Sequence, residues 1–499
     1  MKARPNIVMF ISDQQRADTM PGVTNVDAQT PHLAWLTERS TAFRNAFCAS
    51  PLCTPARGSI LTGLHPHTSG IEANYNPQCR RVTVRNDVKF LADYLKPQGY
   101  QCAYTGKWHL PTGDDRRGFS DFVSRLSVWD VDSPESDDAL RFAQRVGADI
   151  GTTYTEYLSD DDSRGPTDGG ETKLPLAFHP STLQAQQAST FVRQMKDDDR
   201  PFLLVYSCIE PHAMGNRFNV SPCPFDRMYD PTTMPLPTTR RQDDAPLVAR
   251  KRLKKNDLIP TDNYSDDQLQ GLIADYYGAV SYVDHLTGIL LEALIETDQF
   301  DDTLFIFTSD HGEMLGDHRM LKKGPLMFEE LIQIPLLIKP PGPMTDGREI
   351  SSLVSHVDLV PTILNYCETE PARQTDGCDI RSLVEGSNTP VRNGLAVEYH
   401  SVNAGNATCP LRCWRTLDWK YVETIGGDDE LYNLKTDPDE IHNLIQDPKA
   451  KSNLDQLRGQ LNDWLADSKD PWPDVAQVPE PDREPGIWAK LAESSRQSD

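Results

Sequence analysis

Two apolar runs, each followed by an aspartate, constrain the fold of this chain more than any other feature. Residues 6–11 and 303–309 are continuous stretches rich in β-branched and aromatic side chains, which is typical of strands buried on both faces of a parallel sheet. Asp13 follows the first run and Asp310 follows the second. Because ligands of open α/β sheets bind beyond the carboxyl ends of the strands, we expect both carboxylates at one metal site. The alternative is a loop or helix-capping role for each aspartate.

A third apolar run, residues 202–207, strengthens this interpretation. His212 follows it, and a position after another strand favours a role at the same site over a histidine in a proline-directed turn. Helical spacing of apolar residues predicts helices near 181–195, over 272–295 and near 450–467. Strands that alternate with helices predict the α/β class, with a central, mostly parallel sheet flanked by helices.

The sequence changes in character after about residue 370, where short alternating runs are separated by turns. Such runs predict a small antiparallel sheet. We therefore divide the chain into a catalytic domain, 1–370, and a smaller C-terminal α+β subdomain, 371–499, with a closing helix and a tail. Two segments without apolar periodicity, 114–180 and 213–265, are expected to be irregular loops around the mouth of the site.

The net charge of −24 excludes nucleic acid as a partner, since nucleic-acid binding needs a basic surface. It also means that an anionic substrate needs a local cationic pocket. No run approaches the ~20 apolar residues of a membrane span, and the N-terminus leads into a strand without a signal sequence, so we expect a cytoplasmic protein without a membrane partner. The ten cysteines lack a framework spacing, which indicates reduced thiols, and the isolated pair Cys409 and Cys413 does not predict zinc.

Cys53 is the strongest candidate for a nucleophile. It lies in the stretch Cys53-Thr54-Pro55-Ala56-Arg57, where neighbouring prolines predict a turn before a helix-like run; a buried structural thiol is the alternative. The stretch resembles the Cys-x-Pro-x-Arg signature of the type I sulfatases, formylglycine-dependent enzymes of the alkaline phosphatase superfamily. In that family a formylglycine-generating enzyme oxidises the cysteine to an aldehyde, whose hydrate is the nucleophile.

The resemblance extends along most of the chain. Residues 59–70 resemble the second sulfatase signature, residues 106–109 its Gly-Lys-Trp-His segment, residues 322–340 its lysine-containing segment and residues 430–444 its C-terminal block. The resemblance implies an alkaline-phosphatase-like fold and a hydrolase of sulfate monoesters. One departure is Gln14, where many sulfatases carry a second acid.

The resemblance also implies roles for individual residues. The implied catalytic residues are Cys53, Arg57, Lys107, His109, His212 and Lys323. The implied substrate contacts are Lys107, His212, Lys323 and, from phosphonate hydrolases, Asn74. The implied metal ligands are Asp13, Gln14, Cys53, Asp310 and His311. Arg57 and Lys107 would hold the formylglycine, His109 would act as a base, and His212 would protonate the leaving oxygen.

The expected cofactors are the formylglycine and one divalent cation. Oxygen ligands favour Ca²⁺ or Mg²⁺, whereas the His311 nitrogen and the Gln14 amide make the site less hard, so that Mn²⁺ competes. Ca²⁺ is our first choice. The expected partners are a small-molecule sulfate ester, the maturation enzyme, and further copies of the chain in a dimer or tetramer.

Two alternatives stay open. Gln14 and His311 resemble the phosphonate monoester hydrolase and choline sulfatase branches, which favours a phosphonate monoester or phosphodiester hydrolase that uses the same site. Lys107, in an intact Gly-Lys-Trp-His segment, favours sulfate esters. A non-catalytic binding protein would require a broken set of catalytic residues, and none of these positions is broken.

Overall fold

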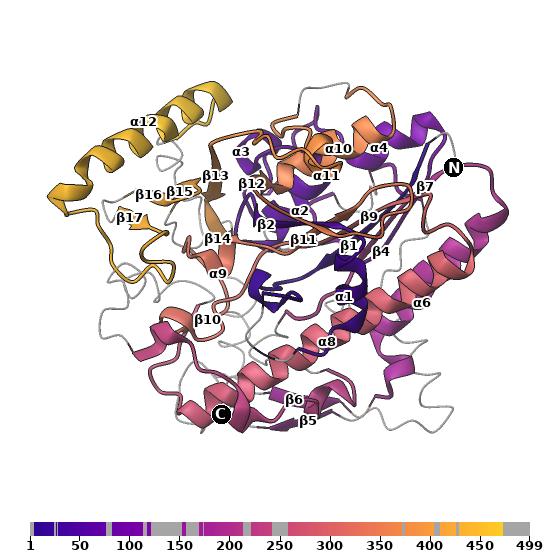
Figure 1. Cartoon of the computed structure of the whole chain (residues 1–499), viewed down its shortest axis with the longest axis horizontal. Helices are drawn as coiled ribbons and strands as arrows, with labels where there is room; N and C mark the ends of the chain where they lie inside the picture. The colour runs from indigo at the N-terminus through magenta and orange to yellow at the C-terminus, as the bar shows by residue number, and fades with distance from the viewer. Residues whose placement is uncertain are drawn as a thin grey trace, which may run out of the picture.

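A seven-stranded sheet forms the centre of the computed structural model (Figure 1). The structure describes residues 4–23, 26, 28–75, 82–112, 117–120, 152–155, 169–172, 174–212, 221–241, 258–371, 375–403, 410–425 and 429–472. The strand order is β12-β2-β11-β9-β1-β7-β4. The strands are β1 Asn6–Ser12, β2 Thr41–Phe47, β4 Gln101–Gly106, β7 Phe202–Ser207, β9 Thr303–Ser309, β11 Leu336–Lys339 and β12 Arg348–Ser355.

The sheet is mostly parallel, as predicted. Strands β1, β7, β4 and β9 run parallel, and β12 runs parallel to β2. Strand β11 is antiparallel to both β9 and β2, between which it lies. Strands β1, β7 and β9 therefore end at the same edge, which brings the residues that follow them together.

Both faces of the sheet are covered by helices, which explains why its central strands are apolar throughout. On β1, Met9 packs into the core beneath α2, α4 and α10, whereas Phe10 packs against α1, α6 and α8 (Figure 1). These helices are α1 Pro31–Thr37, α2 Cys53–Thr62, α4 Leu91–Leu95, α6 Pro180–Gln194, α8 Asp266–Glu296 and α10 Leu359–Tyr366. The predicted helices near 181–195 and over 272–295 are thus confirmed.

Helix α8 begins six residues earlier than predicted, because a capping box fixes its start. The Ser265 hydroxyl accepts from the backbone N–H of Gln268 at 3.1 Å, and the side-chain carbonyl of Gln268 accepts from the backbone N–H of Ser265 at 2.8 Å. By length and composition α8 could cross a membrane, yet 78% of its most apolar window is buried inside the fold. Its apolar surface is therefore core surface.

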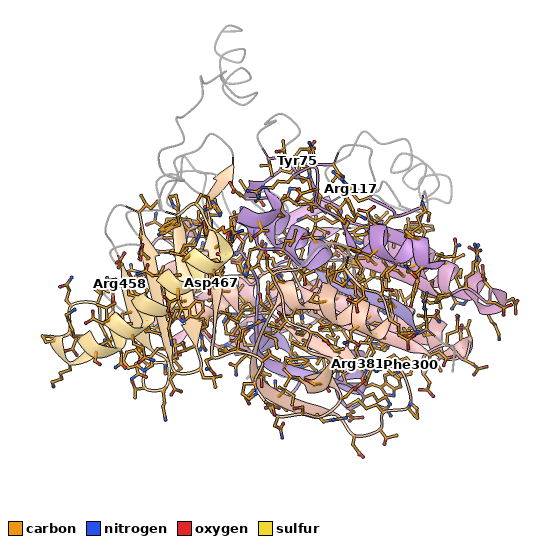
Figure 2. All side chains as sticks on the ribbon, turned by 90° about the horizontal axis from the view of Figure 1, so that it is seen from above. Tyr75, Arg117, Phe300, Arg381, Arg458 and Asp467 are labelled. Atoms are coloured by element: carbon orange, nitrogen blue, oxygen red, sulfur yellow. The ribbon has the colours of Figure 1, made fainter. Side chains whose placement is uncertain are left out.

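The C-terminal part of the chain forms the predicted antiparallel sheet, in the order β13-β15-β16-β17. Its strands are β13 Gly394–Tyr399, β15 Leu411–Thr416, β16 Trp419–Thr424 and β17 Glu430–Asn433. Helix α12, Lys451–Ser468, packs four leucines against this sheet. Figure 2 shows α12, with Arg458 and Asp467, beside the catalytic domain. The boundary between residues 370 and 371 stays a prediction.

The two segments predicted to be irregular contain short regular elements. Strands β5 Thr152–Thr155 and β6 Gly169–Thr172 pair antiparallel, so the prediction for 114–180 is wrong there. In the second segment, β8 Ile259–Pro260 pairs with β10 Met320–Leu321. A backbone ladder can form without an apolar pattern, and for that reason periodicity missed both pairs. Most other residues of 114–180, and many of 213–265, lie outside the described residues.

A buried group of charged side chains joins the catalytic domain to the C-terminal subdomain; we call it the junction cluster. It consists of His67, Glu398, His400, Arg412 and Asp470. His67 Nδ1 lies 2.6 Å from Glu398 Oε1, and His400 Nε2 lies 3.1 Å from Glu398 Oε2. Arg412 donates from Nε to Asp470 Oδ2 at 2.6 Å and from Nη2 to Oδ1 at 3.0 Å. Burial lowers the pKa of His67, but Glu398 and Asp470 outweigh it and raise that pKa to about 9. His67 is then positively charged at neutral pH, beside the Glu398 carboxylate.

Candidate active site

Cys53 is the first residue of helix α2 and is 1% exposed. The prediction that Cys53 itself lies in the turn is wrong, because the bend covers residues 49–52 and the helix starts at the cysteine. The Asn74 side-chain carbonyl accepts from the Thr54 N–H at 3.1 Å and so satisfies one of the open N–H groups of the first turn. A thiol at a helix N-terminus meets the positive end of the helix dipole, which favours the thiolate.

The residues after β1 and β9 meet beside Cys53, as the strand pattern predicts. One ligand atom each from Asp13, Cys53, Asp310 and His311 lies within 4.8 Å of the others, and all four residues are buried. His311 Nδ1 lies 2.9 Å from the Gly312 carbonyl oxygen, which assigns the proton to Nδ1. His311 Nε2 lies 3.2 Å from Cys53 Sγ. Burial lowers the pKa of His311, but Asp310 and Cys53 outweigh burial and raise it, so a metal ion at Nε2 would replace a proton there. Carboxylate oxygens with one imidazole nitrogen fit a divalent cation.

Arg57 bridges the two aspartates. Its Nη2 donates to Asp13 Oδ2 at 2.8 Å and its Nε donates to Asp310 Oδ2 at 2.9 Å. Nη1 donates to the Lys107 carbonyl at 2.9 Å and to the Ser207 hydroxyl at 2.7 Å. Each aspartate thus gives one oxygen to Arg57 and turns the other towards Cys53 or Gln14. Arg57 is placed to fix the carboxylates, and its hydrogen bonds do not go to Cys53.

Two lysines bring positive charge to the cysteine. Lys107 Nζ lies 2.5 Å from Asp13 Oδ2 and 3.6 Å from Cys53 Sγ. Lys323 Nζ lies 2.9 Å from Cys53 Sγ and 2.7 Å from Gln14 Oε1. Burial raises the pKa of the Cys53 thiol, but Lys107, Lys323 and His311 outweigh burial and hold it well below its usual value. The site stabilises negative charge at this atom.

Two histidines complete the surroundings of the cysteine. His212 Nε2 lies 3.9 Å from Asp13 Oδ1, and burial together with Lys323 lowers the pKa of His212 to about 4. His109, with a φ of +52°, places Nε2 3.1 Å from the Tyr75 carbonyl oxygen. Burial also lowers the pKa of His109. Both imidazoles are therefore neutral near pH 7.

Glu313 is a buried acid whose role the sequence interpretation missed. Its carboxylate accepts from the side-chain amide of Gln14 and from the backbone N–H of Lys322, and it accepts from the Leu315 N–H at 3.0 Å. The Gln14 carbonyl oxygen is thereby turned towards Lys323. Glu313 follows His311 by two residues in Asp-His-Gly-Glu, and this position at the carboxyl edge was the available signal. Asn74 was predicted to contact substrate. In the structure its side-chain carbonyl oxygen accepts a hydrogen bond from the Thr54 N–H in the first turn of α2.

A mostly parallel sheet with a charged site at its carboxyl edge defines the class, an α/β protein with an alkaline-phosphatase-like fold. Among solved structures, the phosphonate monoester hydrolase SpPMH of Silicibacter pomeroyi has a TM-score of 0.77 at 23% sequence identity, covering 93% of this chain and 96% of that chain. This likeness concerns the fold alone.

The family follows from the sequence comparisons. The family model described as Sulfatase matches residues 5–368, and the chain belongs to the sulfatase family of sulfuric ester hydrolases. A second model, N-sulphoglucosamine sulphohydrolase, C-terminal, matches residues 316–467.

Two relatives are similar over nearly their whole length. The uncharacterized sulfatase YidJ of Escherichia coli is 28% identical over 472 residues, which cover 94% of this chain and 88% of the relative. An arylsulfatase of Clostridium perfringens is 25% identical over 479 residues, covering 91% and 93%. The predicted fold and family are thereby confirmed.

Proposed function

We propose that this sulfatase hydrolyses small-molecule sulfate monoesters with Cys53, converted to formylglycine, as its nucleophilic residue. One observation carries the proposal: Cys53 opens helix α2 with two lysine ammonium groups within 3.6 Å and with the donor set of Asp13, Asp310 and His311 beside it. An aldehyde hydrate at this position supplies one hydroxyl as nucleophile and a second hydroxyl that allows the aldehyde to form again.

One divalent cation, held by Asp13, Gln14, Asp310 and His311, is part of the proposal. Such an ion lowers the pKa of a nearby hydroxyl and polarises a sulfate group. The Nε2 of His311, which faces Cys53, and the carboxylate oxygens that Arg57 leaves open support the fit. Ca²⁺ is the ion we propose first, and elemental analysis of the purified protein distinguishes it from Mn²⁺ and Mg²⁺.

Two lysines provide the local positive charge that an anionic substrate needs on a protein with a net charge of −24. At an effective dielectric constant near 20, a cation about 4 Å from a sulfate contributes roughly 4 kcal/mol before desolvation. Lys107 and Lys323 are buried and unscreened, whereas the diffuse surface charge is screened within about 10 Å by salt. We assign both lysines to the sulfuryl oxygens, with Lys107 also holding the modified residue.

The two histidines carry the proton transfers. We assign His109, which borders Cys53, to the base that takes a proton from the modified residue. His212 is assigned to the leaving alcohol oxygen. Its pKa of about 4 describes the free site, and a sulfate anion beside the imidazole raises that pKa because an opposite charge favours the protonated form.

A phosphonate monoester or phosphodiester hydrolase is the second candidate, favoured by Gln14 and His311 as ligands. The ratio of kcat/KM for an aryl sulfate to that for a phenyl phosphonate ester separates the two. A ratio above one supports sulfate esters, and a ratio below one supports the alternative.

The decisive experiment is the mass of the peptide that contains Cys53, from protein expressed together with a formylglycine-generating enzyme. The aldehyde mass is expected in the active protein. An unmodified thiol, in a preparation where that enzyme modifies a control protein, contradicts the proposal.

We further propose a cytoplasmic homo-oligomer of two or four chains that binds neither nucleic acid nor membranes. The eight cysteines among the described residues are all free, which supports a reducing compartment. The net charge of −24 supports the absence of nucleic acid. Light scattering of the purified protein measures the oligomeric state, and a monomer contradicts that part of the proposal.

A further inference from the structure

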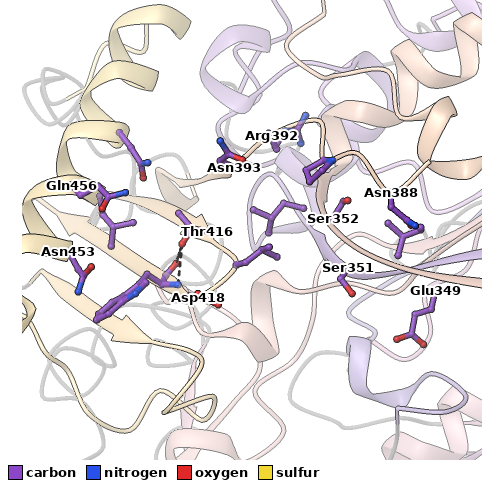
Figure 3. A pocket seen from close by; sticks show the side chains of 17 residues that line it. Glu349, Ser351, Ser352, Asn388, Arg392, Asn393, Thr416, Asp418, Asn453 and Gln456 are labelled. Atoms are coloured by element: carbon purple, nitrogen blue, oxygen red, sulfur yellow. Dashed lines mark hydrogen bonds between the residues drawn. The ribbon is translucent and has the colours of Figure 1, made fainter. Parts of the chain in front are cut away.

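A pocket of about 660 Å³ opens between the catalytic domain and the C-terminal subdomain. Figure 3 shows its lining, which comes from strand β12, the loop 388–393, the turn 416–419 and helix α12. None of the active-site residues named above lines this pocket. It is therefore a separate cavity, and its walls indicate which ligand it can hold.

Carboxamides dominate the polar lining. Asn388, Asn393, Asn453 and Gln456 face the pocket (Figure 3), and none of their side chains forms a hydrogen bond within the part of the chain that the structure describes. The side-chain carbonyl oxygen of Gln460 accepts a hydrogen bond from the Trp414 indole N–H at 3.0 Å. A carboxamide both donates and accepts, as a hydroxyl group does, so free amides fit a ligand rich in hydroxyl groups.

The charges of the lining exclude an anionic ligand. Arg392 is the single cation among the lining residues, and its two Nη atoms are engaged by the Asp358 carboxylate at 2.7 and 2.5 Å. Glu349 pairs with Arg44 at 2.6 Å. Asp418 is left as an exposed acid. Recognition of a sulfate or phosphate group needs an available arginine or lysine, and this pocket offers none.

Apolar surface lies next to the amides. Trp419 is half-buried, Leu353 and Leu457 form part of the wall, and Leu417 at the turn is 51% exposed. Small-molecule sites combine such apolar walls with a few polar groups that fix orientation. A sugar ring matches this combination, because it has C–H faces and hydroxyl edges.

We propose that this pocket binds an uncharged sugar segment of an oligosaccharide. The pocket is thus a second binding site, with the opposite electrostatic preference from the cationic active site. An added peptide strand fits less well, because the register of β12 shifts between Ile350 and Leu353 and the Ser351 carbonyl already accepts from Asn45 at 2.7 Å. The proposal does not depend on the proposed hydrolysis.

The test is isothermal titration of the full-length protein with cello-, xylo-, manno- and malto-oligosaccharides, and with a sulfated carrageenan oligosaccharide, each at up to about 10 mM. We expect at least one neutral probe to bind with a Kd on the order of 1 mM or lower. The double variant Asn453→Ala/Gln456→Ala removes two partly exposed amides of α12 and is expected to weaken that binding about 10-fold or more.

The control is Gln186→Ala/Gln187→Ala, which removes two exposed amides from α6, away from the pocket, and is expected to leave binding unchanged. Both variants are expected to keep the unfolding temperature and the kcat/KM for an aryl sulfate of the parent. The titrations overturn the proposal if no neutral probe binds, whether or not the sulfated probe does, or if binding survives in the α12 variant. A dimer that Leu417→Asp dissociates also overturns it, since a second copy then fills the pocket.

Discussion

The active site and the junction cluster are built from the same kinds of residue, yet their hydrogen bonds differ. Both place histidine and carboxylate ligand atoms within 4.8 Å of one another in a buried setting. In the junction cluster, Arg412 takes both oxygens of Asp470, and both oxygens of Glu398 face histidine nitrogens. In the active site, Asp13 Oδ1 lies 3.8 Å from Cys53 Sγ and 3.9 Å from His212 Nε2, longer than good hydrogen bonds.

The two clusters contain similar residues, and they differ in how many of their carboxylate oxygens accept short hydrogen bonds. This property, more than residue composition, separates a structural cluster from a reactive one. A buried ion pair with all its lone pairs engaged holds two elements together. A buried carboxylate with an open lone pair keeps a position for a cation. Substitutions in the two clusters should therefore have different effects on activity and on stability.

The largest effect is expected for Cys53→Ala. Loss of the nucleophilic residue should lower kcat/KM for an aryl sulfate by about 10⁴-fold or more, while the unfolding midpoint in urea changes little. Cys48→Ala removes another fully buried thiol and should keep activity. Activity of the Cys53 variant within about 100-fold of the parent would remove this cysteine from the mechanism.

Arg412→Met should lower stability and leave activity nearly unchanged, the reverse of Cys53→Ala. It leaves the buried Asp470 carboxylate without its guanidinium partner, which typically costs about 3–5 kcal/mol of stability. The free energy of unfolding is measured in urea, and kcat/KM per folded molecule should stay close to that of the parent. Arg381→Met breaks an exposed pair with Glu385 and should change stability by about 1 kcal/mol or less. A catalytic defect in folded Arg412→Met protein would mean that the junction cluster acts in the reaction.

Lys323→Met should lower kcat/KM by roughly 10²–10³-fold, because a preorganised positive charge beside the reacting group is lost. Its neighbour Lys322 is half-exposed, and its backbone N–H donates to the Glu313 carboxylate. Lys322→Met is therefore the matched control and should retain activity. Equal losses in the two variants would contradict the assignment of Lys323 to the sulfuryl group.

The junction cluster should weaken at alkaline pH. The pKa of His67 is raised from 6.5 to about 9 by Glu398 and Asp470 against the effect of burial. A raised pKa stabilises the fold fully below pH 6.5, and this contribution is lost as pH rises through 9. Its size is on the order of 3 kcal/mol. Unfolding measured in urea at pH 6 to 10 should show the loss, and His67→Gln should flatten it; a parallel decline in this variant assigns the loss to other groups.

The smallest effect concerns metal removal. Chelation should lower the stability of the parent by roughly 2–3 kcal/mol if the ion was present at about 100 times its Kd. Asp310→Asn should abolish this sensitivity, whereas Asp470→Asn should keep it, since both oxygens of Asp470 already accept from Arg412. Thermal unfolding with and without chelator measures both. If chelation instead lost its effect on stability only in Asp470→Asn, the metal ion would be assigned to the junction cluster and not to the active site.

Local patterns predicted the parts of the molecule that depend on near neighbours along the chain. The runs 6–11, 202–207 and 303–309 formed strands, and Asp13 and Asp310 met where parallel strands end. Apolar periodicity is a local property, and a parallel sheet brings the ends of its strands together whatever the loops do.

Features that depend on distant partners escaped prediction. Helix α2 starts at Cys53 because Asn74, further along the chain, caps its first turn. The junction cluster pairs His67 with Glu398, 331 residues away. Side-chain contacts at such separations leave no periodic trace in the sequence, and neither the start of the helix nor the cluster could be found without the fold.

If Cys53 is converted to formylglycine as proposed, its burial sets the order of that conversion and of folding. At 1% exposure, beneath Lys107 and Lys323, the thiol is out of reach of a maturation enzyme once the chain has folded. Under the proposed mechanism, oxidation must therefore come first, while the segment around residue 53 is still extended. Under the same mechanism, a chain that folds before this oxidation would keep its thiol and would be inactive. The active fraction of each preparation is then fixed at the time of translation, and later treatment of the folded protein cannot raise it.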